Sequence, residues 1–146
     1  MMAAQHEEAY PKMYLYKRIV QAKLFIDANY TEQLDLHQIA DEAFFSRFHF
    51  LRLFRQTYGA TPHQYLVSKR VAKARELLEQ GLPVSQVCSD IGFESLGSFS
   101  SLFKKQTGES PSAYQLRRRQ LRAEVAEVPL RFVPNCFLHA RTSATI

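Results

Sequence analysis

The chain carries one sequence pattern twice, first within residues 36–66 and again within residues 84–115. At an offset of 48 residues the matched pairs are Leu36 and Val84, Ile39 and Val87, Ala40 and Cys88, and Phe45 and Phe93. After one residue is gained in the second copy, the pairs are Phe50 and Phe99, Leu53 and Leu102, Phe54 and Phe103, Gly59 and Gly108, Pro62 and Pro111, and Tyr65 and Tyr114. This ordered agreement indicates a duplicated supersecondary unit.

Each copy reads as a helix, a tight turn and a second helix. In the first copy Asp35, with Gln38 three residues later, predicts the start of a short helix that runs to about Ala43. Ser46 is the expected cap of the next helix, which Gly59 ends. The second copy repeats these signals with a turn at Gly92, a cap at Ser95, a stop at Gly108 and a new start at Ser110-Pro111. Two helices joined this way form a helix-turn-helix, and the plainer alternative is two ordinary helical hairpins.

The remaining segments also read as helix. Residues 14–29 form an amphipathic pattern, and residues 61–80 predict one long helix that ends at Gly81. We therefore expect an all-α fold of about seven helices, in which a long linker helix joins two helix-turn-helix subdomains. The expected boundaries are an N-terminal tail at 1–13, a first subdomain at 14–60, the linker at 61–81, a second subdomain at 82–122 and a C-terminal extension at 123–146.

Positive charge is concentrated in the two copies. The net charge is +5, yet no Asp or Glu occurs from Ala43 to Arg75. That window holds Arg47, Arg52, Arg55, Lys69, Arg70, Lys73 and Arg75. A second window, from Ser95 to Ala123, holds Lys104, Lys105, Arg117, Arg118, Arg119 and Arg122 against the single acid Glu109. A charge run can simply be a solvated face, but helices without carboxylates are also what a phosphate backbone requires.

The helix expected at 46–57 separates into two faces. The arc predicted to be buried holds Phe50, Leu53, Phe54 and Thr57. The opposite arc holds Phe48, Leu51, Arg52 and Arg55, with Arg47, His49 and Gln56 at its margins. Arginine can bind the O6 and N7 atoms of guanine and apolar groups can contact the thymine methyl, so this mixture suits a DNA major groove. The alternative is that Phe48 and Leu51 pack on a neighbouring helix or are merely exposed.

The equivalent face of the second copy is made of small side chains. Its outward positions are Gly97, Ser100, Ser101 and Lys104, with Ser98 beside them. Short side chains allow close approach but cannot grip guanine, so we expect weaker base reading here and more reliance on phosphate contacts and DNA shape. The residues expected to contact phosphates in the two copies are Ser46, Arg55, Ser95, Lys104 and Lys105.

The segment "PVSQVCSDIGFESLGSFSSLFKKQTGESPSAY" resembles the signature of the AraC/XylS family of bacterial transcription regulators. The first copy and the linker "VSKRVAKARELLEQG" also fit, and the resemblance covers roughly residues 14–120. It implies that the third and sixth helices enter adjacent major grooves of double-stranded DNA. It maps base contacts onto Arg47, Phe48, Leu51, Arg52, Gly97, Ser98, Ser100 and Ser101. It also implies activation more often than repression, through contact with RNA polymerase.

Three features depart from that family's pattern. Phe44 stands where family members usually have glycine, which suggests a distorted first turn. The second reading helix lacks the arginine that many members carry, and about 13 residues before the first helix are too few for an effector-sensing domain. Two reading helices in one chain make a monomer sufficient for binding.

Other functional classes find little support in the sequence. The five histidines lack metal-ligand spacing, no glycine-rich phosphate loop occurs, and no nucleophile motif surrounds Cys88, Ser85 or Ser89, so we expect neither an enzyme nor a cofactor. No apolar run is long enough to span a membrane, and Cys88 and Cys136 make no disulfide framework, so we expect a cytoplasmic protein. The resemblance implies that it is bacterial and associated with the nucleoid when bound to DNA. The tail from residue 123 is expected to be a packed or frayed extension, and the alternative is a segment that binds a partner. The remaining alternative to DNA binding is a helical protein-interaction module with solubilising basic faces.

Overall fold

The computed structural model describes residues 9–42 and 46–127, and within these ranges every regular secondary-structure element is a helix. The helices are α2 (Ala9–Asn29), α3 (Leu36–Glu42), α4 (Arg47–Tyr58), α5 (Pro62–Glu79), α6 (Val84–Asp90), α7 (Leu96–Thr107) and α8 (Pro111–Glu127). The predicted all-α fold with about seven helices is therefore confirmed. The expectation of a distorted turn at Phe44 and the expectations for the tail beyond residue 127 lie outside the described residues.

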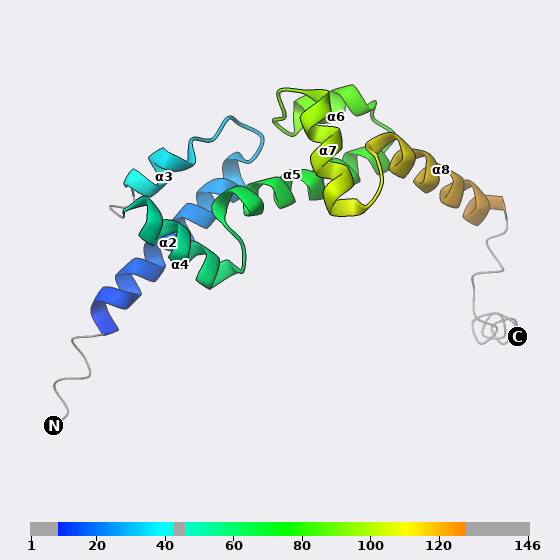
Figure 1. Cartoon of the computed structure of the whole chain (residues 1–146). Helices are drawn as coiled ribbons and strands as arrows, with labels where there is room; N and C mark the ends of the chain where they lie inside the picture. Colours follow the sequence, from blue (N-terminus) through cyan, green and yellow to red (C-terminus); the bar gives the residue numbers. More distant parts are fainter. Residues whose placement is uncertain (1–8, 43–45, 128–146) are drawn as a thin grey trace, which may run out of the picture.

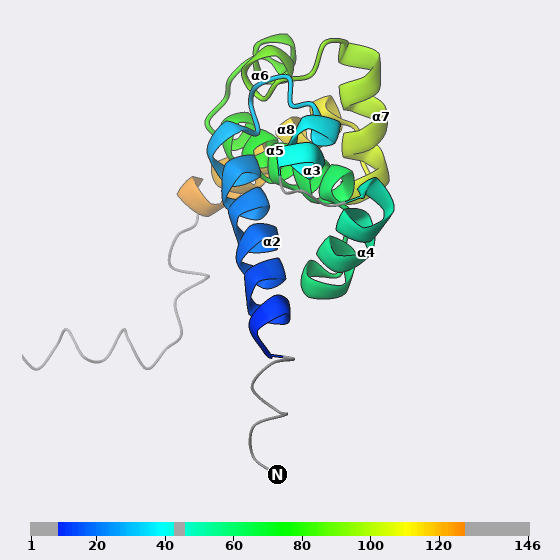
Figure 2. The same cartoon turned by 90° about the vertical axis from the view of Figure 1, so that its left-hand side faces the viewer.

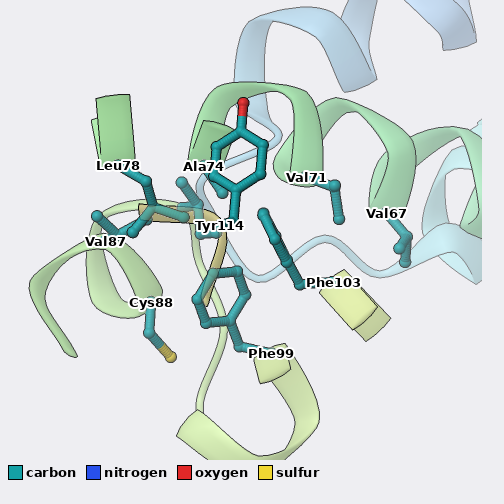
Figure 3. Close-up of a cluster of buried hydrophobic side chains, with 10 residues drawn as sticks. Val67, Val71, Ala74, Leu78, Val87, Cys88, Phe99, Phe103 and Tyr114 are labelled. Atoms are coloured by element: carbon teal, nitrogen blue, oxygen red, sulfur yellow. The ribbon is translucent and has the colours of Figure 1, made fainter. Parts of the chain in front are cut away.

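Helix α5 joins two lobes, with α2, α3 and α4 around one end and α6, α7 and α8 around the other (Figure 1). Each lobe has its own hydrophobic core. The first core contains Ile19, Ala22, Ile26, Ile39, Ala40, Phe50, Phe54 and Leu66. The second contains Val67, Val71, Ala74, Leu78, Val87, Cys88, Ile91, Phe99, Phe103 and Tyr114 (Figure 3). No buried residue belongs to both cores, although α5 supplies side chains to each, so the molecule consists of two packed units on one shared helix.

The duplicated sequence produces duplicated helix ends. The hydroxyl of Ser46 accepts a hydrogen bond from the amide of His49 at 3.3 Å, and the hydroxyl of Ser95 accepts one from the amide of Ser98 at 3.2 Å. Both helices end at a glycine with positive φ, and its amide donates to a carbonyl four residues back at 2.8 Å in each case. Only glycine adopts this conformation without strain, which is why α4 and α7 stop at matched positions.

Local signals also define the starts of α5 and α3. Thr61 and Gln64 form a complete capping box at the start of α5, and Asp35 accepts a hydrogen bond from the amide of His37 at 2.9 Å before α3. The prediction for Thr57 was wrong, because it is exposed instead of packed in the first core. Its hydroxyl donates to the carbonyl of Leu53 on its own helix at 2.8 Å, so the group is satisfied without burial.

Candidate nucleic-acid interface

Helix α4 presents a mixed cationic and apolar face to solvent. Arg47, Arg52 and Arg55 are exposed, and Phe48 is 84% exposed. Phe48 is therefore not packed on a neighbouring helix, which removes one of the two plainer interpretations of its position. Leu51 is half-buried and lines a shallow groove beside Arg47 and α3. The opposite face buries Phe50 and Phe54, whose rings pack 5.9 Å apart, so the core fixes which residues point outward.

The arginines of this face are available to a ligand. None of Arg47, Arg52 and Arg55 forms an ion pair with a carboxylate in the described part of the chain. Arg52 lies one helical turn from His49, with its Nη2 3.5 Å from Nδ1 of the imidazole. Three guanidinium groups on one short helix that itself contains no Asp or Glu give this face a strong attraction for anions.

Helix α7 presents a smoother face. Gly97, Ser98 and Ser101 are exposed, and Ser100 is half-buried. The hydroxyl of Ser95 donates to the hydroxyl of Ser98 at 2.9 Å, so Ser98 is part of the cap as well as of the surface. Lys104 and Lys105 are exposed in the last turn. This surface allows the backbone to come close to a partner and places its cations at one end.

Leu96 is a further residue on this surface that the sequence reasoning missed. It is 49% exposed at the first position of α7. The offset of 49 residues aligns it with Arg47, and this alignment was the signal that could have identified it. At this equivalent position the two helices therefore carry hydrocarbon in one lobe and a guanidinium in the other.

The two helices that carry these faces lie along one edge of the molecule. Figure 2 shows α4 and α7 along the right-hand edge of the molecule, whereas α2 lies to the left of α4. Figure 1 shows them beside opposite halves of α5. Arg52 and Lys104 are both exposed, as a shared binding surface requires.

Several cations of the two basic windows serve the fold. Arg117 pairs with Glu109, its Nε 2.9 Å from a carboxylate oxygen, and Arg118 pairs with Glu79 at 2.8 Å. Hydrogen bonds from Arg117 lower the pKa of Glu109, although Glu109 is partly buried. Arg70 is 8% exposed, and burial lowers the pKa of its guanidinium. Counting charges along the sequence therefore overstated the number of cations that are free to meet DNA.

A polar network fastens α2 to α5 in the first lobe. Asp27 forms ion pairs with Lys23 at 2.8 Å and Lys69 at 3.1 Å, and accepts a hydrogen bond from Tyr65 at 2.6 Å. Partial burial alone would raise the pKa of Asp27, but the hydrogen bonds from Lys23, Tyr65 and Lys69 outweigh it and lower the pKa to about 2. The carboxylate therefore stays ionised and holds the two helices together at ordinary pH.

Other kinds of site lack geometry in the described part of the chain. There, no group of three or more His, Cys, Asp or Glu side chains is placed to hold a metal ion. Likewise, none of the helices between residues 9 and 127 combines the length and the apolar character that crossing a membrane requires. Cys88 is a free, buried thiol, and burial raises its pKa. It packs as a small apolar residue of the second core.

Comparison with known proteins gives a consistent result. The AraC-type model of the helix-turn-helix domain matches residues 39–128, more than half of the chain. The probable transcriptional regulator LumQ from Photobacterium leiognathi is 35% identical over 105 residues, which cover 68% of this chain and 42% of LumQ. The transcriptional activator AarP from Providencia stuartii is 33% identical over 94 residues, which cover 64% of this chain and 70% of AarP.

A solved structure relates the fold to DNA. The DNA-binding domain of the global transcriptional factor AdpA, crystallised with a target DNA, superposes with a TM-score of 0.63. It is 34% identical, and the match covers 75% of this chain and 96% of that domain. The chain thus spans nearly all of a DNA-binding domain but less than half the length of a longer regulator such as LumQ.

Proposed function

This chain belongs to the AraC-type family of helix-turn-helix DNA-binding domains, and we propose that it regulates transcription by reading two adjacent major grooves with α4 and α7. The observation that carries the proposal is a pair of helices, each with an exposed face and no carboxylate, that lie along one edge of the molecule. Successive major grooves on one face of B-DNA lie about 34 Å apart. One chain with two such helices therefore needs no second copy to occupy both grooves.

Helix α4 supplies most of the sequence selectivity in this proposal. Arg47 and Arg52 are exposed, neither forms an ion pair among the described residues, and each can donate two parallel hydrogen bonds to guanine. Phe48 and Leu51 carry the hydrocarbon that a thymine methyl prefers. Together these four side chains explain why an exposed helix face combines apolar and cationic groups.

Helix α7 contributes close approach to the DNA surface and additional affinity. Its Gly97, Ser98, Ser100 and Ser101 can contact base edges only at close range, because none reaches far from the backbone. Hydroxyl groups bond to several bases, so this helix tolerates more sequences. Lys104 and Lys105 would contribute phosphate contacts that depend little on sequence.

Phosphate contacts also fix the orientation of both helices. Ser46 and Ser95 stand at the N-termini of α4 and α7, where amide groups and the helix dipole favour an anion. Arg55 and Lys104 occupy matched places near the other ends. In this arrangement each reading helix is held by phosphates at both ends, and the bases are contacted between them.

The regulatory output is part of the same proposal. The chain would act in the bacterial cytoplasm, where the DNA is, and would activate transcription by contacting RNA polymerase. The name of AarP as an activator supports this sign of regulation.

Binding to duplex DNA at two salt concentrations tests the proposal directly. Displaced counterions make the logarithm of the affinity fall steeply with the logarithm of the salt concentration, with a slope of about −0.9 for each phosphate neutralised. Selection from a random pool of duplexes would then give the preferred sequence. Affinity that is absent, or that does not change with salt, would instead favour a protein-interaction module.

A further inference from the structure

Arg70 lies on α5, at the junction between the two lobes. Its side chain is buried, with Nε donating to the carbonyl of Tyr30 at 2.6 Å and Nη2 donating to the carbonyl of Glu32 at 2.7 Å. Both carbonyls belong to the loop that connects α2 with α3 in the first lobe. The same guanidinium carbon lies 5.4 Å from the centre of the Phe93 ring in the second lobe. One side chain on the linker therefore contacts both lobes.

The two lobes also meet directly beside Arg70. The side-chain amide of Gln33 donates to the carbonyl of Gly92 at 3.3 Å. A Cβ atom added at Gly92 would lie 2.4 Å from the carbonyl oxygen of Thr31 and 3.1 Å from Nη2 of Arg70. Gly92 therefore allows a close backbone approach between the α2–α3 loop and the turn before α7, in addition to its positive φ of 83°. We refer to Tyr30–Gln33, Arg70 and Gly92–Phe93 as the interlobe clamp.

This contact has a mechanical consequence. The two hydrophobic cores have no buried residue in common and are joined by α5. A single helix sets the distance between two lobes, but each lobe could still rotate around or bend with that helix. The interlobe clamp is a second attachment away from the axis of α5, and two attachments together fix an orientation.

From this geometry we propose that Arg70 is a positioning residue that fixes α7 relative to α4 and thereby sets how many base pairs the protein accepts between its two half-sites. The inference rests on the proposed function. A base pair added between half-sites moves the second by about 3.4 Å and turns it by roughly 35° around the DNA axis. A rigid pair of lobes cannot follow that movement, whereas a loosened pair can.

The first test measures the orientation without DNA. Nitroxide labels are attached at Gln56→Cys on α4 and Gln106→Cys on α7, both exposed positions, in the 146-residue chain carrying Cys88→Ala and Cys136→Ser. Pulsed electron paramagnetic resonance then gives the distribution of distances between the labels. We expect one narrow distribution for this parent and a clearly broader one after Arg70→Met, which removes the guanidinium but keeps an unbranched side chain about as long as the methylene stem of arginine. An unchanged distribution would overturn the proposal.

Arg75→Met is the matched control for that experiment. Arg75 lies on the same helix, and its Nε is 3.4 Å from the Tyr114 hydroxyl, within the second lobe. The substitution removes the same charge and the same guanidinium group without touching the first lobe. Its distance distribution should stay narrow, and broadening equal to that of Arg70→Met would show that the effect does not come from the clamp.

A second pair of variants covers the case in which Arg70→Met does not fold. Gly92→Ala and Gly108→Ala both place a Cβ at a positive φ, but only Gly92→Ala brings it against Thr31, since nothing lies within 4 Å at Gly108. We therefore expect a broadened or shifted distribution for Gly92→Ala alone. Equal distributions for the two variants would count against the clamp.

The last test measures how the affinity for DNA depends on the spacing between the two half-sites. The duplex selected by the wild-type protein from a random pool is remade with one and with two base pairs inserted between the two footprints. We expect the wild-type protein to lose about tenfold in affinity or more with each duplex, as for a lost base contact. Arg70→Met should lose clearly less than the wild type, while Arg75→Met should behave like the wild type. If Arg70→Met loses as much affinity as the wild type on the lengthened duplexes, the role assigned to Arg70 is refuted. If the wild-type protein selects no duplex at all, the proposed function fails instead, and the resonance measurement still tests the clamp.

Discussion

The two lobes share a scaffold but present different surfaces. In both, a serine caps the reading helix, two phenylalanines bury its inner face, a glycine with positive φ ends it and a proline begins the next helix. The outer faces diverge at matched positions, since Phe48 corresponds to Gly97 and Arg52 to Ser101. Duplication has thus preserved the residues that define the fold and has left the solvent face free to change.

This difference separates structural from functional constraints. A buried phenylalanine pair has few replacements of the same volume, because interiors are tightly packed. An exposed arginine costs little to replace in the folded state, so its presence depends on what it binds. The positions that agree between the lobes therefore report on folding, and those that differ report on recognition.

The largest effect should come from truncating a buried side chain in one hydrophobic core at a time. Phe54→Ala and Phe103→Ala each remove a side chain that is fully buried, and such truncations cost about 3–5 kcal/mol. Because the cores have no buried residue in common, the damage should stay mostly in one lobe. Hydrogen exchange measured by mass spectrometry should show faster exchange in α3 and α4 for Phe54→Ala and in α6 and α7 for Phe103→Ala. Equal loss of protection in both lobes for each variant would show that the lobes fold as one unit.

The next effect concerns the side chains that differ between the lobes. Arg52→Ala should relax the preference for one base pair at a cost of roughly 1–3 kcal/mol, because a bidentate contact to guanine is lost. The reciprocal change, Ser101→Arg, should add a preference for guanine in the other half-site. Binding-site selection with each variant measures both. If Arg52→Ala weakens specific and random duplexes equally, Arg52 contacts phosphate instead.

An acid-sensitive contact distinguishes the first lobe. The pKa of Asp27 is lowered to about 2, below its ordinary value of 3.8, so the ionised carboxylate stabilises the folded state. This stabilisation is complete above the ordinary pKa and is lost as the pH falls from about 5 towards 2. Allowing for partial exposure of Asp27, we expect Asp27→Asn to cost about 1–2 kcal/mol at pH 7 and much less at pH 2.5. Thermal unfolding at the two pH values measures the difference, and an equal cost at both would exclude the ionised carboxylate as the cause.

The sequence predicted the elements of this molecule better than the contacts between them. Helix starts and stops follow from short-range chemistry, such as the serine caps and Gly59 or Gly108, and the phenylalanine spacing identified the buried faces of α4 and α7. Thr57 was misplaced because a helical wheel treats every position on an arc as equally buried, even at the end of a helix. Arg70 was counted as a surface charge, because its carbonyl partners 38 and 40 residues away form no pattern along the chain.

The smallest effect should come from the positions at which the lobes agree on charge. Arg55 and Lys104 align at the offset of 49, both lie in the last turn of a reading helix, and the glycine amide that ends the helix donates to the carbonyl of each. Since we assign both to phosphates, Arg55→Ala and Lys104→Ala should each weaken selected and random duplexes alike and reduce the salt slope by about one. Neither should change the selected sequence, and Glu94→Ala, which removes an exposed acid, should not lower the affinity for either duplex. A change of sequence preference after Arg55→Ala alone would mean that the lobes use this shared position differently, and that agreement between the two copies does not extend from folding to recognition.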